Sequence, residues 1–290
     1  MNFYGGAMTE IKNGILSAKI DERGSQLTSV CSVKTGREYI WGADPKIWGR
    51  SAPILFPAVG RMYTDGYIYK GKRYKMSKHG FLRDEMLSVK ENKGNAASFI
   101  YRPTERIKEI YPFDFTFETS FSLSGNTLVT EYTVENNGDE TMFFSLGAHP
   151  GFSCNMGDKV TFSEREAEKA PYFDKDDRPS GKEFAFLSEG KSFYITDDIF
   201  FEGSIVFSSP NSKSVSLSEN EEEYMRIEFG KVPHLWIWAK QGAKFICIEP
   251  WHGADECVPQ EDISKKSGII SLLPKERFSF PIKMVFPKEI

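Results

Sequence analysis

The stretch of sequence that decides the fold is Phe115-Thr-Phe-Glu-Thr-Ser-Phe-Ser-Leu-Ser-Gly-Asn-Thr-Leu-Val-Thr-Glu-Tyr-Thr-Val134. Apolar and polar residues alternate on both sides of Ser124-Gly125-Asn126. Alternation with a period of two places one set of side chains on a single face of a strand, and small polar residues reverse the chain. The stretch therefore predicts an antiparallel β-hairpin with one buried face.

The same alternation recurs along most of the chain, punctuated by Gly, Asn, Asp and Pro. Aromatic residues make up 14% of the sequence, and most of them follow the strand period. We therefore predict an all-β fold built from large antiparallel sheets. The further predicted strands lie within Ile15–Ile20, Leu87–Tyr101, Val160–Phe162, Phe184–Leu187, Ser214–Phe229, Leu235–Trp238, Phe245–Ile248 and Phe278–Phe286.

One segment has helical spacing instead. Ile107, Ile110 and Tyr111 stand at i, i+3 and i+4, Thr104 can cap the N-terminus and Pro112 ends the segment. It predicts a short helix, so the fold should contain one or two short helices. The acidic run Glu219–Glu223 predicts a solvated turn between two strands.

Composition excludes several classes of protein. The 290 residues carry a net charge of -4, which gives no general attraction to nucleic acid, and no apolar run approaches the roughly 20 residues that span a bilayer. The N-terminus has neither the basic start nor the apolar core of a secretory signal, so we expect a cytoplasmic protein. A chain of this length can form a single β-sandwich, and we predict one domain over residues 1–290. The sequence predicts no oligomeric state.

The cysteines give no sign of a metal site or a disulfide. Cys31, Cys154, Cys247 and Cys257 are far apart and lack CxxC spacing. We expect reduced thiols and no bound metal.

His149 is a candidate catalytic residue. It stands in Ser145-Leu-Gly-Ala-His-Pro-Gly-Phe152, where an apolar strand meets a Pro-Gly break. A strand end is a position from which a scaffold presents functional groups. A structural histidine that bonds a turn is the competing interpretation, and the local sequence does not choose between them.

The other three histidines carry weaker signals. His79 lies in Lys78-His-Gly-Phe-Leu-Arg-Asp84, where Arg83 could share a pocket with it, although by itself the motif indicates a surface histidine. His234 precedes a predicted strand and is interpreted as structural. His252 is interpreted as a solvent-facing turn residue.

Glu249 has a context similar to that of His149. It follows the apolar strand Phe245-Ile-Cys-Ile and precedes Pro250 and Trp251. Partial desolvation would raise the pKa of such a carboxylate and make it a better base. An exposed glutamate at the strand end is the alternative. Arg61, which ends an apolar segment, could bind substrate oxygens or pair with an acid.

Together these motifs resemble the aldose 1-epimerase family and, more narrowly, its shorter LacX-like branch. The match runs across most of the chain in the family's order. The motifs that carry it are Leu55-Phe-Pro57 with Gly60-Arg61, Tyr67–Tyr74, His79-Gly-Phe-Leu-Arg83, Gly147-Ala-His-Pro-Gly-Phe152 and Ile248-Glu-Pro-Trp251.

The resemblance implies a large antiparallel β-sandwich, the galactose mutarotase-like supersandwich, and an isomerase that interconverts the α and β anomers of a sugar without cofactor or metal. In the family mechanism a glutamate takes the proton of the C1 hydroxyl while a histidine protonates the ring oxygen. By motif, Glu249 is the base and His149 the acid. His79 and Arg61 would orient sugar oxygens, and among the neighbouring aromatic residues Trp251 and Phe152 would contact the ring.

The substrate stays open at this point. The aspartate with which larger galactose mutarotases bind sugar hydroxyls has no identified equivalent in this sequence. Related hexose-6-phosphate mutarotases hold the phosphate with arginines near the same histidine motif, so Arg61 and Arg83 could form a phosphate clamp. The expected partner is therefore a small-molecule aldose or a sugar phosphate.

Other classes of function fit less well. A non-catalytic carbohydrate-binding protein on the same fold has no need of both His149 and Glu249. A glycoside hydrolase needs a second carboxylate, and only Glu249 has a motif context. A zinc enzyme would show closer ligand spacing than these histidines have.

Overall fold

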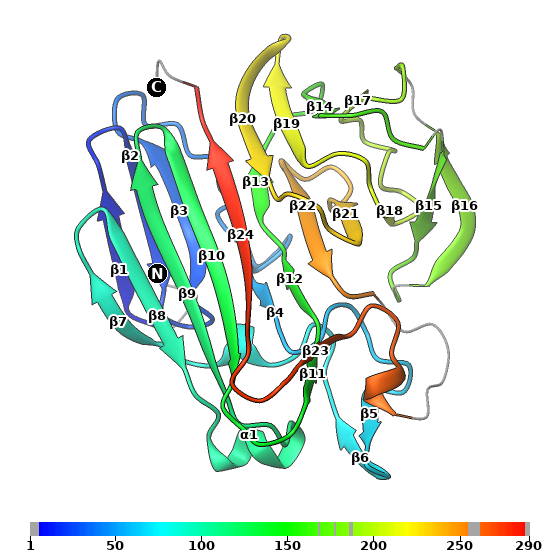
Figure 1. Ribbon diagram of the computed structural model, residues 1–290. Helices are drawn as coiled ribbons and strands as arrows, with labels where there is room; N and C mark the ends of the chain where they lie inside the picture. Colours follow the sequence, from blue (N-terminus) through cyan, green and yellow to red (C-terminus); the bar gives the residue numbers. More distant parts are fainter. Residues whose placement is uncertain (1–5, 168, 177, 186–187, 255–261, 288–290) are drawn as a thin grey trace.

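The computed structural model describes residues 6–167, 169–176, 178–185, 188–254 and 262–287. Two large antiparallel sheets dominate it, which confirms the predicted all-β class (Figure 1). The first sheet has the order β17-β14-β19-β20-β24-β10-β9-β8-β7. Its strands are β17 (Ser192–Tyr194), β14 (Lys159–Phe162), β19 (Ser214–Glu219), β20 (Glu222–Glu228), β24 (Arg277–Val285), β10 (Thr127–Asn136), β9 (Phe115–Ser124), β8 (Ala96–Tyr101) and β7 (Ser88–Asn92).

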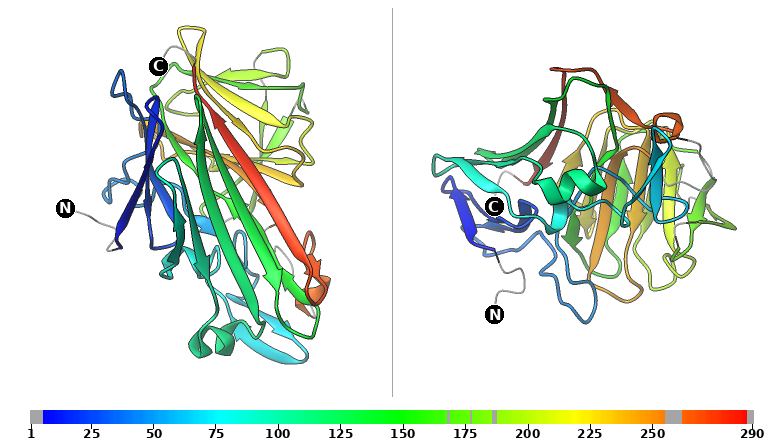
Figure 2. Two further views of the ribbon diagram at one scale, coloured as in Figure 1. Left: turned by 60° about the vertical axis from the view of Figure 1, so that its left-hand side comes forward. Right: turned by 90° about the horizontal axis from the view of Figure 1, so that it is seen from below.

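The second sheet has the order β16-β15-β18-β21-β22-β12-β4, and β13 also pairs with β22. Figure 2 shows this sheet and the first one from two further directions. Its strands are β16 (Pro179–Ala185), β15 (Lys169–Phe173), β18 (Ser204–Ser208), β21 (His234–Trp238), β22 (Phe245–His252), β12 (Leu146–Ala148), β4 (Ile54–Leu55) and β13 (Gly151–Ser153).

Smaller elements complete the structure. A three-stranded sheet contains β1 (Met8–Lys12), β2 (Leu16–Asp21) and β3 (Gln26–Ser32). Two strand pairs are β5 (Gly66–Tyr69) with β6 (Lys72–Lys75) and β11 (Met142–Phe144) with β23 (Ile270–Leu272). The helices of the described residues are α1 (Glu105–Ile110) and two 3₁₀ turns, η1 (Leu82–Asp84) and η2 (Ile263–Lys265). None of these helices is long and apolar enough to cross a membrane.

The hairpin predicted from residues 115–134 is β9 and β10. Phe121 pairs with Thr130 and Ser124 with Thr127, so the turn lies at Gly125-Asn126. Phe117 and Phe121 are buried, as the alternation requires. The predicted helix is also confirmed, because Thr104 caps α1 by accepting a hydrogen bond from the backbone N–H of Ile107.

Strand alternation gives the second sheet two different faces. Ile205, Leu235, Ile237, Ile246 and Ile248 belong to the main hydrophobic core, which also contains side chains of β9 and β10. The other face carries a separate apolar cluster made of Leu55, Val59, Val206, Trp236 and Trp251. This second face is the one that holds the candidate site.

One strand boundary differs from the prediction. The strand that begins at Phe245 does not end at Glu249 but continues through Pro250 to His252. On one side of β22, β12 pairs with it at Trp251 and β13 pairs with it at Cys247. Pro250 lies between these two pairing regions. Since the ladder on this side is interrupted there, a residue without an N–H is tolerated.

Three of the four cysteines lie among the described residues. Cys31, Cys154 and Cys247 are free cysteines. Cys257 lies outside the described residues, and so do residues 186 and 187 of the segment Phe184–Leu187.

Candidate active site

Strand register brings the candidate residues together on one face of the second sheet. Trp236 of β21 pairs with Glu249 of β22, and Gly147 of β12 pairs with Trp251. Cross-strand partners share a face, as do residues two apart in one strand. Trp236, Trp238, Glu249 and Trp251 therefore point to the same side, away from the main core.

A cleft with a volume of about 850 Å³ opens on this face. Its walls come from several loops as well as from the sheet. Residues that line it near the catalytic candidates are Trp48, Arg50, Lys78, His79, Arg83, His149, Trp236, Trp238, Glu249 and Trp251.

His149 and Glu249 meet in this cleft. Nε2 of His149 lies 3.3 Å from Oε2 of Glu249, and their side chains are 11% and 3% exposed. His149 directly follows β12, and its ring stacks on the indole of Trp48 with ring centroids 5.0 Å apart. Two ionisable side chains are thus held in contact at the wall of a cleft.

The surroundings of His149 disfavour its imidazolium form. Burial, followed by the positive charges of Lys78 and Arg83, lowers the pKa of His149 to about 3. Both effects disfavour the protonated ring.

His79 is held in one tautomer by the backbone. The N–H of Gly60 donates to Nδ1 of His79 at 3.0 Å, so the ring proton of the neutral imidazole is on Nε2. Burial and the neighbouring His149 hold the pKa of His79 well below its usual range, which keeps the ring neutral. His79 is therefore a buried residue of the cleft and not the surface histidine that its local motif indicates.

The backbone around His79 is strained. His79 itself has a φ of 65°, and Gly80 has a φ of 73° with the place of a Cβ 2.1 Å from the carbonyl oxygen of Phe56. Only glycine fits at position 80. This close approach fixes the histidine against the segment that contains Gly60.

Trp251 forms one end of an aromatic wall. Its indole stacks on that of Trp236 with centroids 4.4 Å apart, and the ring of His79 lies edge-on to it at 5.7 Å. Gly147 leaves room for this indole, because a Cβ there would lie 2.7 Å from Cδ1 of Trp251. Trp48 and Trp238 continue the wall beyond His149.

The cleft also has a positive region. Arg83 lines it and donates to the carbonyl oxygen of Lys78 at 2.7 Å. Burial, with the charge of Arg50 as the next cause, lowers the pKa of Arg83 to about 10. Arg50 and Lys78 line the same part, and Arg50 pairs with Asp84 at 2.7 Å.

Two residues expected at the site lie elsewhere. Phe152 has no exposed surface and packs in the main core, where it pairs with Ile246. Arg61 is absent from the cleft lining and lies 3.4 Å from Asp65. Neither residue is therefore among those that line the cleft.

The remaining histidines lie away from the pair. His252 is the last residue of β22, not a turn residue, and it packs between Phe278 and Phe280 with centroids 5.3 and 4.6 Å from its ring. His234 begins β21, and its Nδ1 is 3.4 Å from the hydroxyl of Ser208.

A metal-ligating geometry is partly present. Side-chain atoms of His149, Cys247 and Glu249 lie within 4.8 Å of one another. Burial raises the pKa of the Cys247 thiol well above its usual value, which disfavours the thiolate that binds metals. Lys78 and Arg83 add positive charge. The arrangement suits proton transfer better than cation binding.

Sequence reasoning did not identify Trp48, Arg50, Lys78, Trp236 or Trp238 as site residues. The motif His234-Leu-Trp-Ile-Trp238 did contain a signal, since its period of two puts both tryptophans on one face. Trp48 and Arg50 come from a loop, and no local pattern marks their position.

Comparisons with known proteins show the family of the chain. The aldose 1-epimerase family model matches residues 8–284. The plasmid-encoded protein LacX of Lactococcus lactis subsp. lactis is 31% identical over 288 residues, which cover 91% of this chain and 94% of LacX.

Solved structures show the same fold. A galactose mutarotase related enzyme from Lactobacillus acidophilus has a TM-score of 0.89 and 28% identity, and the match covers 97% of each chain. A galactose mutarotase-like protein from Lactobacillus casei has a TM-score of 0.89 and 26% identity, covering 97% of this chain and all of that one. With its sheets, its cleft and these relatives, the chain belongs to the aldose 1-epimerase family.

Proposed function

We propose that this protein is an aldose 1-epimerase that interconverts the α and β anomers of a hexose. The observation that carries the proposal is the contact between His149 and Glu249 in the cleft, at 3.3 Å. Anomer exchange moves protons at the C1 hydroxyl and at the ring oxygen, and both oxygens are bonded to C1. A neighbouring acid and base can reach both of them.

The proposed reaction begins with proton removal. Glu249 takes the proton of the C1 hydroxyl, the bond between C1 and the ring oxygen breaks, and His149 gives its Nε2 proton to that oxygen. The product is the open-chain aldehyde. Rotation about C1–C2 exposes the other carbonyl face. His149 then takes the proton back from the hydroxyl that closes the ring, and Glu249 returns its proton to the oxygen on C1. The proton count and the oxidation state are unchanged overall.

The cleft supports this chemistry electrostatically. A sugar ring oxygen is a weak base, and an imidazolium with a lowered pKa, although less populated near neutral pH, transfers its proton to that oxygen more readily than the imidazolium of a free histidine. His79, with its proton fixed on Nε2, can donate to a substrate oxygen. The stacked indoles of Trp236 and Trp251 offer an apolar surface for the ring.

The proposal is tested by the rate at which freshly dissolved α-D-glucose and α-D-galactose approach anomeric equilibrium, measured by polarimetry. The protein should accelerate at least one of them in the absence of any cofactor. If no aldose or aldose phosphate is accelerated, the epimerase proposal fails.

Variants assign the two roles. Glu249→Gln and His149→Asn should each lower kcat by about 10²- to 10⁴-fold, the usual contribution of a positioned acid or base. His234→Asn is the matched control, because His234 lies outside the cleft lining. The assignment would be refuted if only the control variant lost activity, or if Glu249→Gln and His149→Asn both kept the wild-type activity.

A hexose phosphate is the second candidate substrate, favoured by the cations in the cleft. Arg50, Lys78 and Arg83 line the same region as His79 and His149. Their positive charges could hold a phosphate group. Comparing glucose and galactose with their 6-phosphates decides between the candidates, and Arg83→Met should raise KM only for the phosphates if this group is bound there.

A further inference from the structure

The cleft extends well beyond the catalytic pair. Glu249 of β22 lies at the catalytic end of the cleft. The far end is lined by Asp174, which follows β15, and by Ser180 of β16. The order β16-β15-β18-β21-β22 places three strand spacings between β15 and β22. At about 4.8 Å per step these span roughly 14 Å, which exceeds the width of a single pyranose ring.

The volume leads to the same conclusion. Pockets of ~300–1,000 Å³ hold drug-sized ligands, and a single hexose is much smaller than these. A cleft of about 850 Å³ therefore leaves room beside a hexose that occupies the catalytic end.

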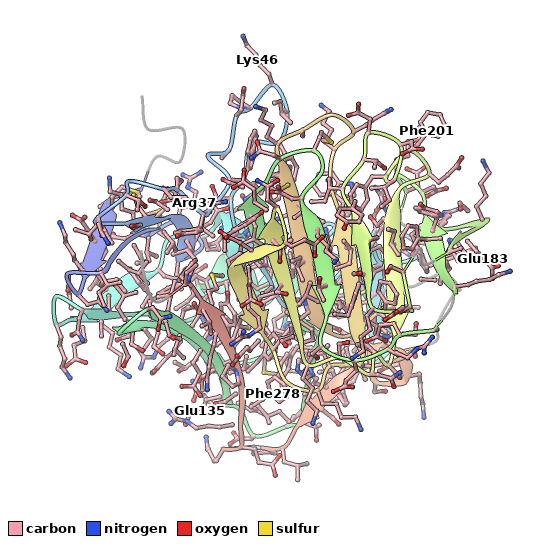
Figure 3. All side chains as sticks on the ribbon, turned by 90° about the horizontal axis from the view of Figure 1, so that it is seen from above. Arg37, Lys46, Glu135, Glu183, Phe201 and Phe278 are labelled. Carbon is pink, nitrogen blue, oxygen red and sulfur yellow. The ribbon has the colours of Figure 1, made fainter. Side chains whose placement is uncertain are left out.

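An aromatic side chain marks the outer part of the cleft. Phe201 lines it and is 69% exposed, the largest exposure among the large hydrophobic residues described. Figure 3 shows Phe201 at the outer edge of the molecule, on the side of the second sheet that also carries Glu183 of β16. An apolar ring so exposed offers an open face to a ligand.

The loop that carries Phe201 is anchored beneath it. The neighbours Ile199 and Phe200 are buried, and the hydroxyl of Tyr172 donates to the carbonyl oxygen of Ile199 at 2.7 Å. The N–H of Phe201 donates to the carbonyl oxygen of Asp198 at 3.0 Å. The ring is thus presented from a fixed backbone, which lowers the entropy cost of binding against it.

The charge of the outer part suits a neutral polar ligand. The charged side chains that line it are two carboxylates, Asp174 and Glu202, and two ammonium groups, Lys175 and Lys240, and Glu202 also pairs with Lys182. Gln241 lines the same end and provides a neutral donor and acceptor. The excess positive charge lies instead around Arg50 and Arg83, so a phosphate would bind at the catalytic end.

We infer that the outer part of the cleft is a second saccharide subsite, and that the preferred substrate is the reducing end of a disaccharide or short oligosaccharide. The inference rests on the proposed function. Because the reaction needs a free C1 hydroxyl, the second unit is linked to the reacting ring through another hydroxyl. Its apolar face stacks on Phe201, while Gln241 and Ser180 bond its hydroxyls.

The first experiment compares α-lactose and β-maltose with α-D-glucose, since glucose is the reacting ring in all three. Initial rates of mutarotation are followed by polarimetry over a range of concentrations. At least one disaccharide should show a kcat/KM about ten-fold above that of glucose. Acceleration of glucose and galactose without any gain for the disaccharides would overturn the subsite and leave the epimerase proposal intact. If no sugar is accelerated, the epimerase proposal itself fails.

Variants locate the subsite. Phe201→Ala should raise KM for the preferred disaccharide about ten-fold and leave the constants for glucose unchanged, while Phe201→Tyr should retain the wild-type values. Leu273→Ala is the matched control, because Leu273 is 55% exposed and outside the cleft lining. Equal effects of Phe201→Ala on glucose and disaccharide would contradict the inference.

Discussion

Among single residues, Lys78 has a defined electrostatic effect on the candidate acid. After burial, its charge is the largest cause of the lowered pKa of His149. It acts in the same direction on His79. The protonation of the catalytic pair therefore depends on a cation that contributes no proton to the proposed reaction.

Removing this charge should change the pH profile of the enzyme. Lys78→Met raises the pKa of His149, so the imidazolium persists to higher pH and the basic limb of kcat/KM moves upward. The pH dependence of mutarotation measures this. Lys240→Met is the control, because Lys240 lines the cleft but is not among the causes of the His149 shift. A basic limb that stays in place would show that His149 is not the acid.

Between elements, the approach of β12 to β22 depends on Gly147. The place of a Cβ at this position is 2.7 Å from Cδ1 of Trp251 and 3.0 Å from Cγ1 of Val59. Both neighbours are buried, so neither can move freely. The aromatic wall and the strand that leads to His149 are coupled at this glycine.

Gly147→Ala should therefore destabilise the protein by about 1–3 kcal/mol, the usual cost of overpacking. The displaced Trp251 should also raise KM for the sugar. Urea unfolding and polarimetry give the two quantities. Gly42→Ala is a suitable control, since a Cβ at Gly42 meets nothing within 4 Å. Equal stability of both variants would mean that β12 and Trp251 adjust without cost.

For the whole molecule, the buried histidines couple stability to pH. An unfolded histidine binds a proton with a pKa near ~6.5. In the folded chain burial lowers the pKa of His149 to about 3 and that of His252 to about 4. At pH values between these folded-state pKa values and ~6.5, the unfolded state binds more protons than the folded state does. The free energy of unfolding therefore falls as the pH drops below ~6.5.

Urea unfolding at pH 7.5 and pH 5 should reveal this effect. The loss at pH 5 should be about 2 kcal/mol for each of these two histidines. His252→Phe removes one of these histidines and keeps an aromatic ring beside Phe278 and Phe280. The free energy of unfolding of this variant should therefore fall by about 2 kcal/mol less than that of the wild type. The same pH dependence in wild type and variant would exclude His252 as a source.

The fold and much of the site could be predicted, because their signals are local. Alternation predicted the hairpin at residues 115–134. The ordered motifs selected His149 and Glu249, which the structure places 3.3 Å apart. Periodicity also marked Thr104 as a helix cap.

What the sequence by itself determined is which residues face which side of each strand and which motifs carry ionisable groups. Only the tertiary structure decided that Arg50 and Lys78 enter the cleft, that Arg61 and Phe152 lie outside it, and that β22 continues through Pro250. The physical reason is that alternation is a property of neighbouring residues. The site, in contrast, depends on register and on core packing between segments about a hundred residues apart. These segments are a loop near residue 50, a strand end at 149 and a strand at 249.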